Sequence, residues 1–462
     1  MIFTELSFLA FFALVFGVHW ALRGVRARKL WLLAASYFFY GAWDWRFLSL
    51  IVGSTALDYL VGLRLDAYQD EPARKRWIAL SVVLNLGLLG VFKYANFFLD
   101  SALALARSLG FEASPHVLGI VLPVGISFYT FQTMSYSLDV YRRELRAVRD
   151  PVDFALFVTF FPQLVAGPIV RAIDFLPQLE RVRLWSDVRV RACLTLFLVG
   201  YVKKACVGDN VSSLVDPYFE NPALFDALSA WSAVLFYAVQ IYCDFSGYSD
   251  MAIATAGLFG YELRTNFDFP YLAASIRDFW RCWHMSLSSW LRDYLYIPLG
   301  GNRGSRLFQH RNLLLTMLLG GLWHGAGWNF VIWGALHGGA LVAHREWERA
   351  GLRLPALLGL LATFWWTCLA WIFFRAPTFE GALVTVRSFV LFDSPGPRST
   401  GWVPLATFAA LALLHWACSK RWLERTSECM PSWSYATALG ILVPLALAFT
   451  NAAVKPFIYF QF

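Results

Sequence analysis

One histidine lies where an ionisable side chain is costly. His324 sits in the apolar run LLGGLWHGAGWNFVIWG, beside Gly325 and Gly327, which would let a backbone or a ligand come close. Ionisable residues in such runs usually serve a pathway or a reaction site. A neutral imidazole in a dry site is a workable general base near physiological pH. The alternative, a packed histidine that donates to a backbone carbonyl, stays open, and packing is the favoured interpretation of His337.

A second histidine, His284, lies in the segment SIRDFWRCWHMSLSSWLRDYLYIPLGG, whose spacing predicts one amphipathic helix. The apolar face comprises Ile276, Trp280, Trp283, Leu287, Trp290 and Tyr294. The polar face comprises Arg277, Arg281, His284, Ser288 and Arg292. Two interpretations fit: a helix in the cytoplasmic interface with snorkelling arginines, or a polar face that lines a cytoplasmic funnel with His284 at its inner end.

Further polar residues interrupt the apolar run QIYCDFSGYSDMAIATAGLFG, which contains Asp244, Ser246 and Asp250. The two carboxylates must be paired, neutralised or in contact with water. They indicate either a binding or gating site or a structural pair with a nearby arginine, and the sequence favours neither. Trp323 and Asn329 complete the candidate cavity-lining residues.

The elements that position these residues are membrane spans. Of the 462 residues, 58% are hydrophobic and only 15% are charged, whereas soluble domains are about one quarter charged. The apolar segments run from end to end, which predicts a single integral-membrane domain over residues 1–462. The net charge is +8, and the basic residues lie in short loops between the apolar segments, so we expect no nucleic-acid partner. The seven cysteines are scattered without a CxxC pair, so we expect neither a disulfide framework nor a metal site.

Apolar runs of sufficient length predict ten spans. They are residues 5–22, 31–46, 47–63, 77–98, 117–138, 190–207, 230–258, 356–374, 402–418 and 434–451. The basic clusters fall on one side of these spans, whereas the loop 208–229 has no lysine or arginine. The positive-inside rule therefore places both termini, including the tail 452–462, outside.

Two other apolar stretches have breaks. Residues 154–170 contain Pro162, Gly167 and Pro168, which predict a re-entrant loop or, alternatively, a kinked span. Residues 313–343 are long for one span and predict two half-spans that meet within residues 323–328.

Four motifs, in order, resemble the membrane-bound O-acyltransferase family: FFPQLVAGPIVR, QIYCDFSGYSDMAIATAGLFG, NFDFPYLAASIRDFWRCWHMSLSSWLRDYLYIPLGGNRG and LLGGLWHGAGWNFVIWGALHG. They lie between residues 160 and 340, in a motif-bearing core of about residues 120–345, and are most similar to the branch with the bacterial alginate O-acetylation protein and the teichoic acid D-alanyl transferase. The resemblance implies an all-α polytopic fold. In it, a ring of about ten to twelve tilted helices, with re-entrant segments, surrounds a central tunnel that contains histidine.

The resemblance also implies roles for individual residues. His324 matches the catalytic histidine, and His284 matches the second active-site position. The ending FIYFQF resembles a terminal tyrosine motif of a small membrane subunit in the D-alanyl system, so Tyr459 is a candidate acyl relay. The alternative for Tyr459 is an aromatic interfacial anchor.

The implied activity is transfer of an acyl group, most simply acetyl, from a cytoplasmic thioester such as acetyl-CoA, with no bound cofactor. Arg264, Arg277, Arg281, Arg292 and Arg303 are candidates to meet the donor's phosphates. His324 would take the proton from an acceptor hydroxyl, and His284 would position the thioester or stabilise the oxyanion.

The implied location is the bacterial inner membrane, among lipid, and the implied final acceptor is an envelope polysaccharide. Alginate is the first choice, and cellulose and peptidoglycan are alternatives. A periplasmic partner with a hydrolase-like fold would complete delivery. The rival functions are a lipid-directed acyltransferase and a transporter without chemistry.

Overall fold

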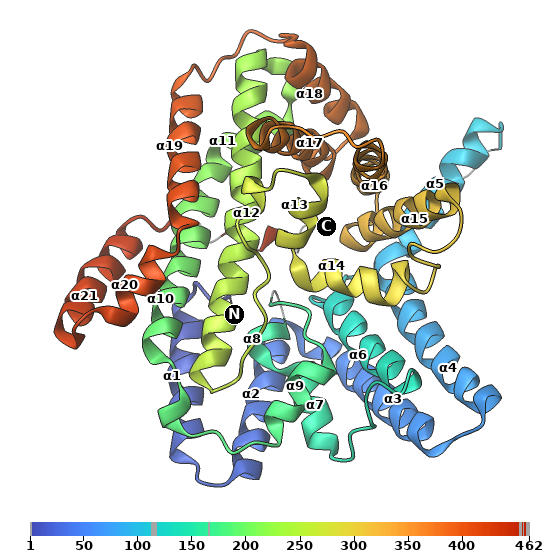
Figure 1. Ribbon diagram of the computed structural model, residues 1–462, viewed down its shortest axis with the longest axis vertical. Helices are drawn as coiled ribbons and strands as arrows, with labels where there is room; N and C mark the ends of the chain where they lie inside the picture. Colours follow the sequence, from blue (N-terminus) through green and yellow to red (C-terminus); the bar gives the residue numbers. More distant parts are fainter. Residues whose placement is uncertain (1, 112–117, 165–166, 452–454, 456, 459–462) are drawn as a thin grey trace. The chain divides into compact units, whose positions relative to one another are not determined.

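The computed structural model describes the chain except for residues 1, 112–117, 165–166, 452–454, 456 and 459–462. Within this described part the chain is helical and forms no strand, and one isolated β-bridge pairs Phe225 with Arg398. It divides into two compact units, residues 1–188 with 255–264, and residues 189–254 with 265–462. Figure 1 shows the helices in chain order.

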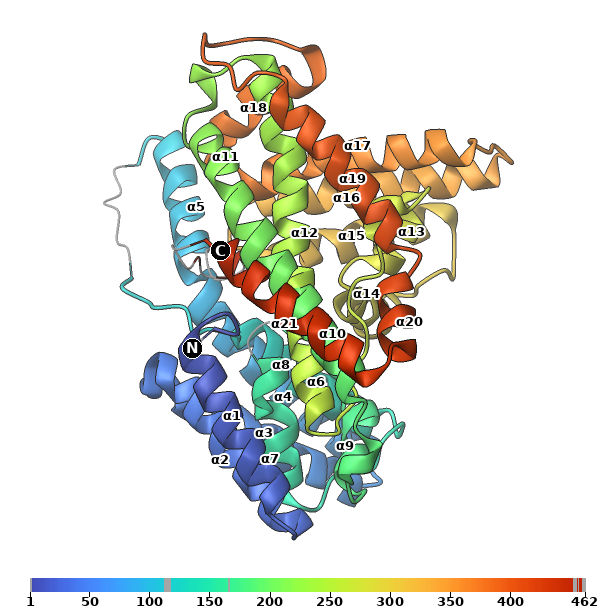
Figure 2. The same cartoon turned by 90° about the vertical axis from the view of Figure 1, so that its left-hand side faces the viewer.

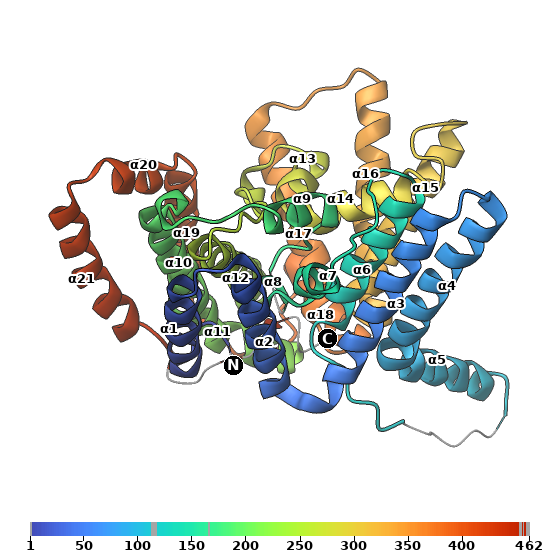
Figure 3. The same ribbon diagram turned by 90° about the horizontal axis from the view of Figure 1, so that it is seen from below.

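The first unit contains nine labelled helices among its described residues. They are α1 (Leu6–Ala21), α2 (Val25–Asp44), α3 (Leu48–Ala67), α4 (Glu71–Leu89), α5 (Ala95–Ser108), α6 (Ile126–Tyr141), α7 (Pro151–Thr159), α8 (Phe161–Leu164) and α9 (Ala172–Leu179). Helices α3, α4 and α6 lie side by side (Figure 3). The buried Asp58 carboxylate on α3 joins them, because it accepts hydrogen bonds from Ser81 and Asn85 on α4 and from Ser137 on α6. Polar bonds of this kind hold helices together where water is excluded.

The predicted break in residues 154–170 is confirmed. Helix α7 ends at Thr159, α8 is a single short turn, and every described residue of the stretch except Ala155 is buried. Side chains replace the lost helical bonds, since the Gln163 amide donates to the Phe157 carbonyl at 2.6 Å and the Phe161 N–H donates to Ser36. Irregular backbone buried in protein in this way is what the bilayer tolerates.

The second unit carries all the candidate site residues except Arg264. Its helices are α10 (Val190–Tyr201), α11 (Asp209–Glu220), α12 (Ala227–Leu258, to residue 254 in this unit), α13 (Ile276–Cys282), α14 (Met285–Leu291), α15 (Arg306–His324), α16 (Trp328–Arg349), α17 (Ala356–Arg375), α18 (Phe379–Leu391), α19 (Val403–Cys418), α20 (Trp422–Cys429) and α21 (Ser432–Ala448). A π-helical segment, Val202–Gly208, joins α10 to α11, and the two run beside α12 (Figure 2). Gly200 and Gly247 allow this approach, because a Cβ on either would lie 2.6 Å from the other's carbonyl oxygen.

All ten predicted spans overlap helices, with two local departures. The span 117–138 becomes helical only at Ile126, because Pro123 and the left-handed Gly125 (φ 75°) precede it. The predicted loop 208–229 contains a helix, α11. In the described part of the chain, four helical stretches are long and apolar enough to cross a membrane, namely Val25–Ala67, Glu71–Ser108, Ala227–Leu258 and Ala356–Arg375.

The predicted break near Trp323 is also confirmed, at residues 325–327, but the flanking helices are longer than half-spans. Helices α15 and α16 have 19 and 22 residues and pack closely against each other. Their contact depends on glycine, because a Cβ at Gly334 would collide with the main-chain carbonyl of Met317, and one at Gly321 with that of Phe330.

We therefore expect Gly334→Ala to destabilise the protein, by about 1–3 kcal/mol as is usual for overpacking, and to lower its melting temperature in detergent. Gly339→Ala, on the same helix, is the matched control, because no atom lies within 4 Å of the position that the added Cβ would take. Alanine also favours a helix over glycine by about 1 kcal/mol, so the control should melt no lower than the wild type. Equal melting temperatures for both variants would contradict this account of the α15–α16 contact.

Candidate active site

The backbone breaks at His284, so the prediction of one continuous amphipathic helix over this segment is wrong. Helix α13 ends at Cys282, and His284 adopts the left-handed region (φ 42°) before α14 begins at Met285. The Met285 N–H donates to the Asn266 carbonyl at 2.9 Å instead of to its own helix. A left-handed non-glycine residue is strained, and such strain is concentrated at functional sites. The predicted apolar face is buried as expected, from Ile276 to Tyr294.

Because of this break, the His284 side chain points into the interior of the protein. Its side chain is fully buried, and its Nδ1 lies 3.2 Å from the Asn266 side-chain oxygen. The same oxygen accepts the N–H and hydroxyl of Ser286, and the Asn266 amide nitrogen donates to Ser249 at 3.2 Å. Because an amide oxygen only accepts, this bond requires a proton on Nδ1. The neutral ring then carries its lone pair on Nε2.

His324 lies next to His284. It is the last residue of α15, it is 2% exposed, and its ring centroid lies 6.4 Å from that of His284. The Trp333 and Phe374 rings meet it edge-on at 4.9 and 5.4 Å. Trp323 contacts both histidine rings, at 6.0 Å from His284 and 5.1 Å from His324. The structure thus brings together three residues that the sequence singled out, inside an aromatic enclosure.

The predicted arginines do not join them. Arg277, Arg281 and Arg292 are 45–66% exposed in their side chains and pair with Glu348, Asp278 and Asp293 respectively. The prediction that His284 shares a face with them is therefore wrong, because the break at residue 284 rotates the histidine inward.

Two other candidates have structural hydrogen bonds. The Ser288 hydroxyl donates to the Trp283 carbonyl at 3.1 Å, which satisfies a group freed by the break. The Asn329 amide donates to the Ala376 carbonyl at 2.9 Å and so ties the start of α16 to the end of α17. His337 is packed as expected, with its ring stacked on Phe279 at 5.9 Å.

The two aspartates of α12 form ion pairs, with lysines rather than with an arginine. Lys204 lies 2.5 Å from Asp244, and Lys203 lies 2.7 Å from Asp250. Ser246, between the aspartates, is fully buried. Sequence reasoning missed both lysines, although two adjacent charges inside the predicted span 190–207 were a visible signal.

The C-terminal tail lies against the same part of α12. Phe457 and Ile458 are buried, and the Ile458 N–H donates to the Asp244 carboxylate at 2.9 Å. Tyr459, the candidate relay, lies outside the described residues. Ile458, which precedes it, is described.

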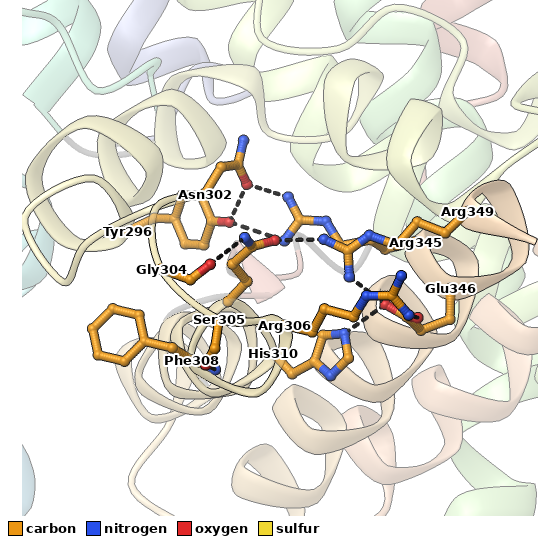
Figure 4. Close-up of polar contacts among 11 residues, drawn as sticks. Tyr296, Asn302, Gly304, Ser305, Arg306, Phe308, His310, Arg345, Glu346 and Arg349 are labelled. Carbon is orange, nitrogen blue, oxygen red and sulfur yellow. Dashed lines mark hydrogen bonds and ion pairs between the residues drawn. The ribbon is translucent and has the colours of Figure 1, made fainter.

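A cluster of basic side chains lies where the start of α15 meets the end of α16 (Figure 4). Arg306, His310 and Arg349 surround Glu346, with His310 at 2.8 Å and Arg349 at 2.5 Å from its carboxylate. The hydrogen bond from His310, supported by Arg349, holds the pKa of Glu346 below its usual value. Arg345 donates to the Tyr296 hydroxyl at 3.3 Å and also to Asn302. Sequence reasoning missed this gathering, because α15 and α16 bring together basic residues that lie some 40 positions apart.

Among the described residues, no group of three or more histidine, cysteine or acidic side chains could hold a metal ion. The chemistry available at this site is that of two adjacent imidazoles in an apolar enclosure, which suits proton transfer at a hydroxyl or thiol.

Comparison with known proteins identifies the chain. The model of the membrane-bound O-acyltransferase family matches residues 129–365, which include both histidines and Asn266. The chain belongs to this family. It is 46% identical over 387 residues to the probable alginate O-acetylase of Pseudomonas aeruginosa, covering 83% of this chain and 73% of that protein. It is 41% identical over 392 residues to the peptidoglycan O-acetyltransferase of Helicobacter pylori, covering 78% and 73%.

More distantly, this family member is 26% identical over 269 residues to the teichoic acid D-alanyltransferase of Streptococcus thermophilus, covering 55% and 65%. The resemblance inferred from the motifs is thus confirmed. The chain is a membrane-bound acyltransferase with several apolar helices, and the alternative of a transporter without chemistry is set aside.

Proposed function

We propose that this acyltransferase passes an acetyl group from cytoplasmic acetyl-CoA to an envelope polysaccharide, and that the reaction occurs at His324 and His284. The observation that carries the proposal is the pairing of the two buried rings, 6.4 Å apart between centroids, in a site with the tautomer of one ring fixed. An apolar enclosure keeps water away from a reactive acyl group and strengthens polar interactions inside it.

The two histidine rings have different roles in the transfer. The acceptor oxygen attacks the thioester carbonyl carbon while its proton passes to the His324 imidazole. The C–S bond then breaks, and His324 returns the proton to the CoA thiolate, so that an ester and a free thiol result. The hydroxyl has a single proton, which goes to His324, so the role left to His284 is to position the thioester carbonyl for attack. Its tautomer favours this role over oxyanion stabilisation, which needs a donor.

The first acceptor in this proposal is the Tyr459 hydroxyl. Its phenol ester would be a reactive intermediate that splits one difficult transfer into two easier ones. A periplasmic partner protein would then move the acetyl group to the sugar hydroxyl. The bond from the Ile458 N–H, one residue earlier, to Asp244 on α12 supports a tail that reaches toward the active site.

The donor's phosphates, on this proposal, meet the basic cluster of Figure 4 rather than the arginines of α13 and α14. Each guanidinium presents five donors and suits a phosphate group. Arg345 and Arg349 stand on one turn of α16, and Glu346 supplies a single negative charge beside them.

Alginate is the proposed final acceptor, with peptidoglycan as the second candidate, because relatives with these two names match at 46% and 41% identity. Deletion of the gene should remove base-labile acetate from the secreted polysaccharide and leave the muropeptides unchanged. Loss of acetate from the muropeptides alone would replace alginate with peptidoglycan.

Asn266 should be essential for orienting His284. We expect Asn266→Leu to lower kcat by about ten- to a hundredfold, by analogy with the loss seen when the hydrogen-bond partners of metal-bound histidines are removed. The KM for acetyl-CoA should change little, because Asn266 bonds to His284, Ser286 and Ser249 and not to the basic cluster. Asn266→Asp, which keeps an acceptor oxygen, should retain most of the rate. Equal losses in the two variants would contradict the orienting role.

A further inference from the structure

Two lysine–aspartate pairs lie close together on α12 and the segment that precedes α11, yet they differ in their surroundings. The side chains of Lys203 and Asp250 are 25% and 16% exposed, whereas those of Lys204 and Asp244 are 1% and 5% exposed. A deeply buried ion pair is costly unless further hydrogen bonds satisfy its remaining atoms. The second pair therefore needs additional partners.

The C-terminal tail supplies two of those partners, and Asp209 on α11 supplies a third. Asp244 accepts Lys204 on Oδ1 at 2.5 Å and the Ile458 N–H on Oδ2 at 2.9 Å, so both carboxylate oxygens are used. The Lys204 ammonium also donates to the Lys455 carbonyl at 3.2 Å and to Asp209 at 2.6 Å. Both members of the pair thus bind main-chain atoms of the tail.

Apolar contacts connect this tail segment to the active site. Phe457 is fully buried, with its ring 5.3 Å from Phe245 and 4.8 Å from Tyr248. The Phe245 ring also meets His284 edge-on at 4.6 Å. Asp244 and Phe245 are therefore neighbours on α12: Asp244 binds the tail, and Phe245 contacts His284.

A second ion pair also holds the tail. The Lys455 ammonium lies 2.6 Å from Asp216, which also binds Arg375 at 2.8 Å. A cavity of about 250 Å³ lies among these charges, and Ile458 forms part of its wall.

We infer that the Lys204–Asp244 pair is a docking site for the chain's own C-terminal tail, and that Asp244 is a positioning residue that fixes Ile458 beside the active site. The contacts above support the docking of the tail. The role of this docking in catalysis rests on the proposed function of Tyr459 as an acyl relay. A fixed neighbouring residue limits where the relay hydroxyl can go and so raises its effective concentration at the histidines.

Hydrogen–deuterium exchange of the full-length protein in detergent tests the docking, with Asp244→Asn compared against Asp250→Asn. An asparagine has one acceptor oxygen, and at position 244 the charged Lys204 ammonium binds it more strongly than a main-chain N–H does, so the NH₂ group faces the Ile458 N–H and that bond is lost. At position 250 a single oxygen still suffices for Lys203. Exchange of the peptide that contains the Ile458 amide should rise by about tenfold or more in Asp244→Asn, as expected for loss of a hydrogen bond to a charged group.

Unchanged exchange in Asp244→Asn, or an equal rise in both variants, would overturn the inference. Lys455→Met provides a second route if Asp244→Asn does not fold, because its ion pair is about one-third exposed. It should raise exchange of the same peptide a fewfold, and no rise would again overturn the docking. Failure of the proposed relay has a different signature, namely normal protection of the tail in a wild-type protein that never carries acetyl on Tyr459.

Discussion

Replacement of His324 by alanine is expected to lower acetyl transfer by about 10²- to 10⁴-fold, the usual contribution of a positioned general base. The reason is local: the ring lies 6.4 Å from His284 and is enclosed by Trp333 and Phe374, so no water can take over its role easily. The measurement is transfer of radiolabelled acetyl from acetyl-CoA by purified protein in proteoliposomes. Melting temperature and gel filtration verify that the variant is folded.

His337→Phe is the matched control for this loss. His337 is also a buried histidine of the same aromatic region, but its ring stacks on Phe279, and a phenyl ring preserves that contact. Transfer within a fewfold of the wild type is expected. Comparable losses in His324→Ala and His337→Phe would mean that packing, and not proton transfer, explains the first result.

Tyr459→Phe is expected to abolish covalent acetylation of the protein, since only the hydroxyl oxygen can form the ester. Mass spectrometry of the C-terminal peptide, after incubation with acetyl-CoA, should find acetyl on wild-type protein and none on the variant. Hydroxylamine should remove the label, because it cleaves esters. Acetylation of the polysaccharide in cells should fall in parallel.

Tyr435→Phe serves as the control for this variant, because the Tyr435 hydroxyl donates to the Arg191 carbonyl at the start of α10, away from the tail contacts. Its labelling should equal that of the wild type. Equal labelling of wild type and Tyr459→Phe would remove the tyrosine from the pathway and leave direct transfer at the histidines.

The spans and breaks were predictable because apolar length, glycine and proline determine them locally. The interruptions just before Pro162 and at Gly325 illustrate this, as does the burial of the apolar face of α13 and α14. The sequence also indicated His324 and His284, but through motifs rather than through periodicity.

What the sequence could not predict depends on contacts between distant segments. The periodicity around His284 is that of a continuous helix, and the bond from Met285 to Asn266, 19 positions earlier, overrides it. The Lys204–Asp244 pair joins residues 40 positions apart, and its bond to Ile458 spans a further 214. Local patterns carry no information on such pairings.

The central claim is that a thioester reaches the two histidines, and a structure with a non-hydrolysable acetyl-CoA analogue tests it most directly. The predicted result is a carbonyl carbon within about 4 Å of the His324 ring, near attack distance, with phosphate density at Arg345 or Arg349. An analogue whose carbonyl lies away from both rings, while the protein remains folded and active, would contradict the account.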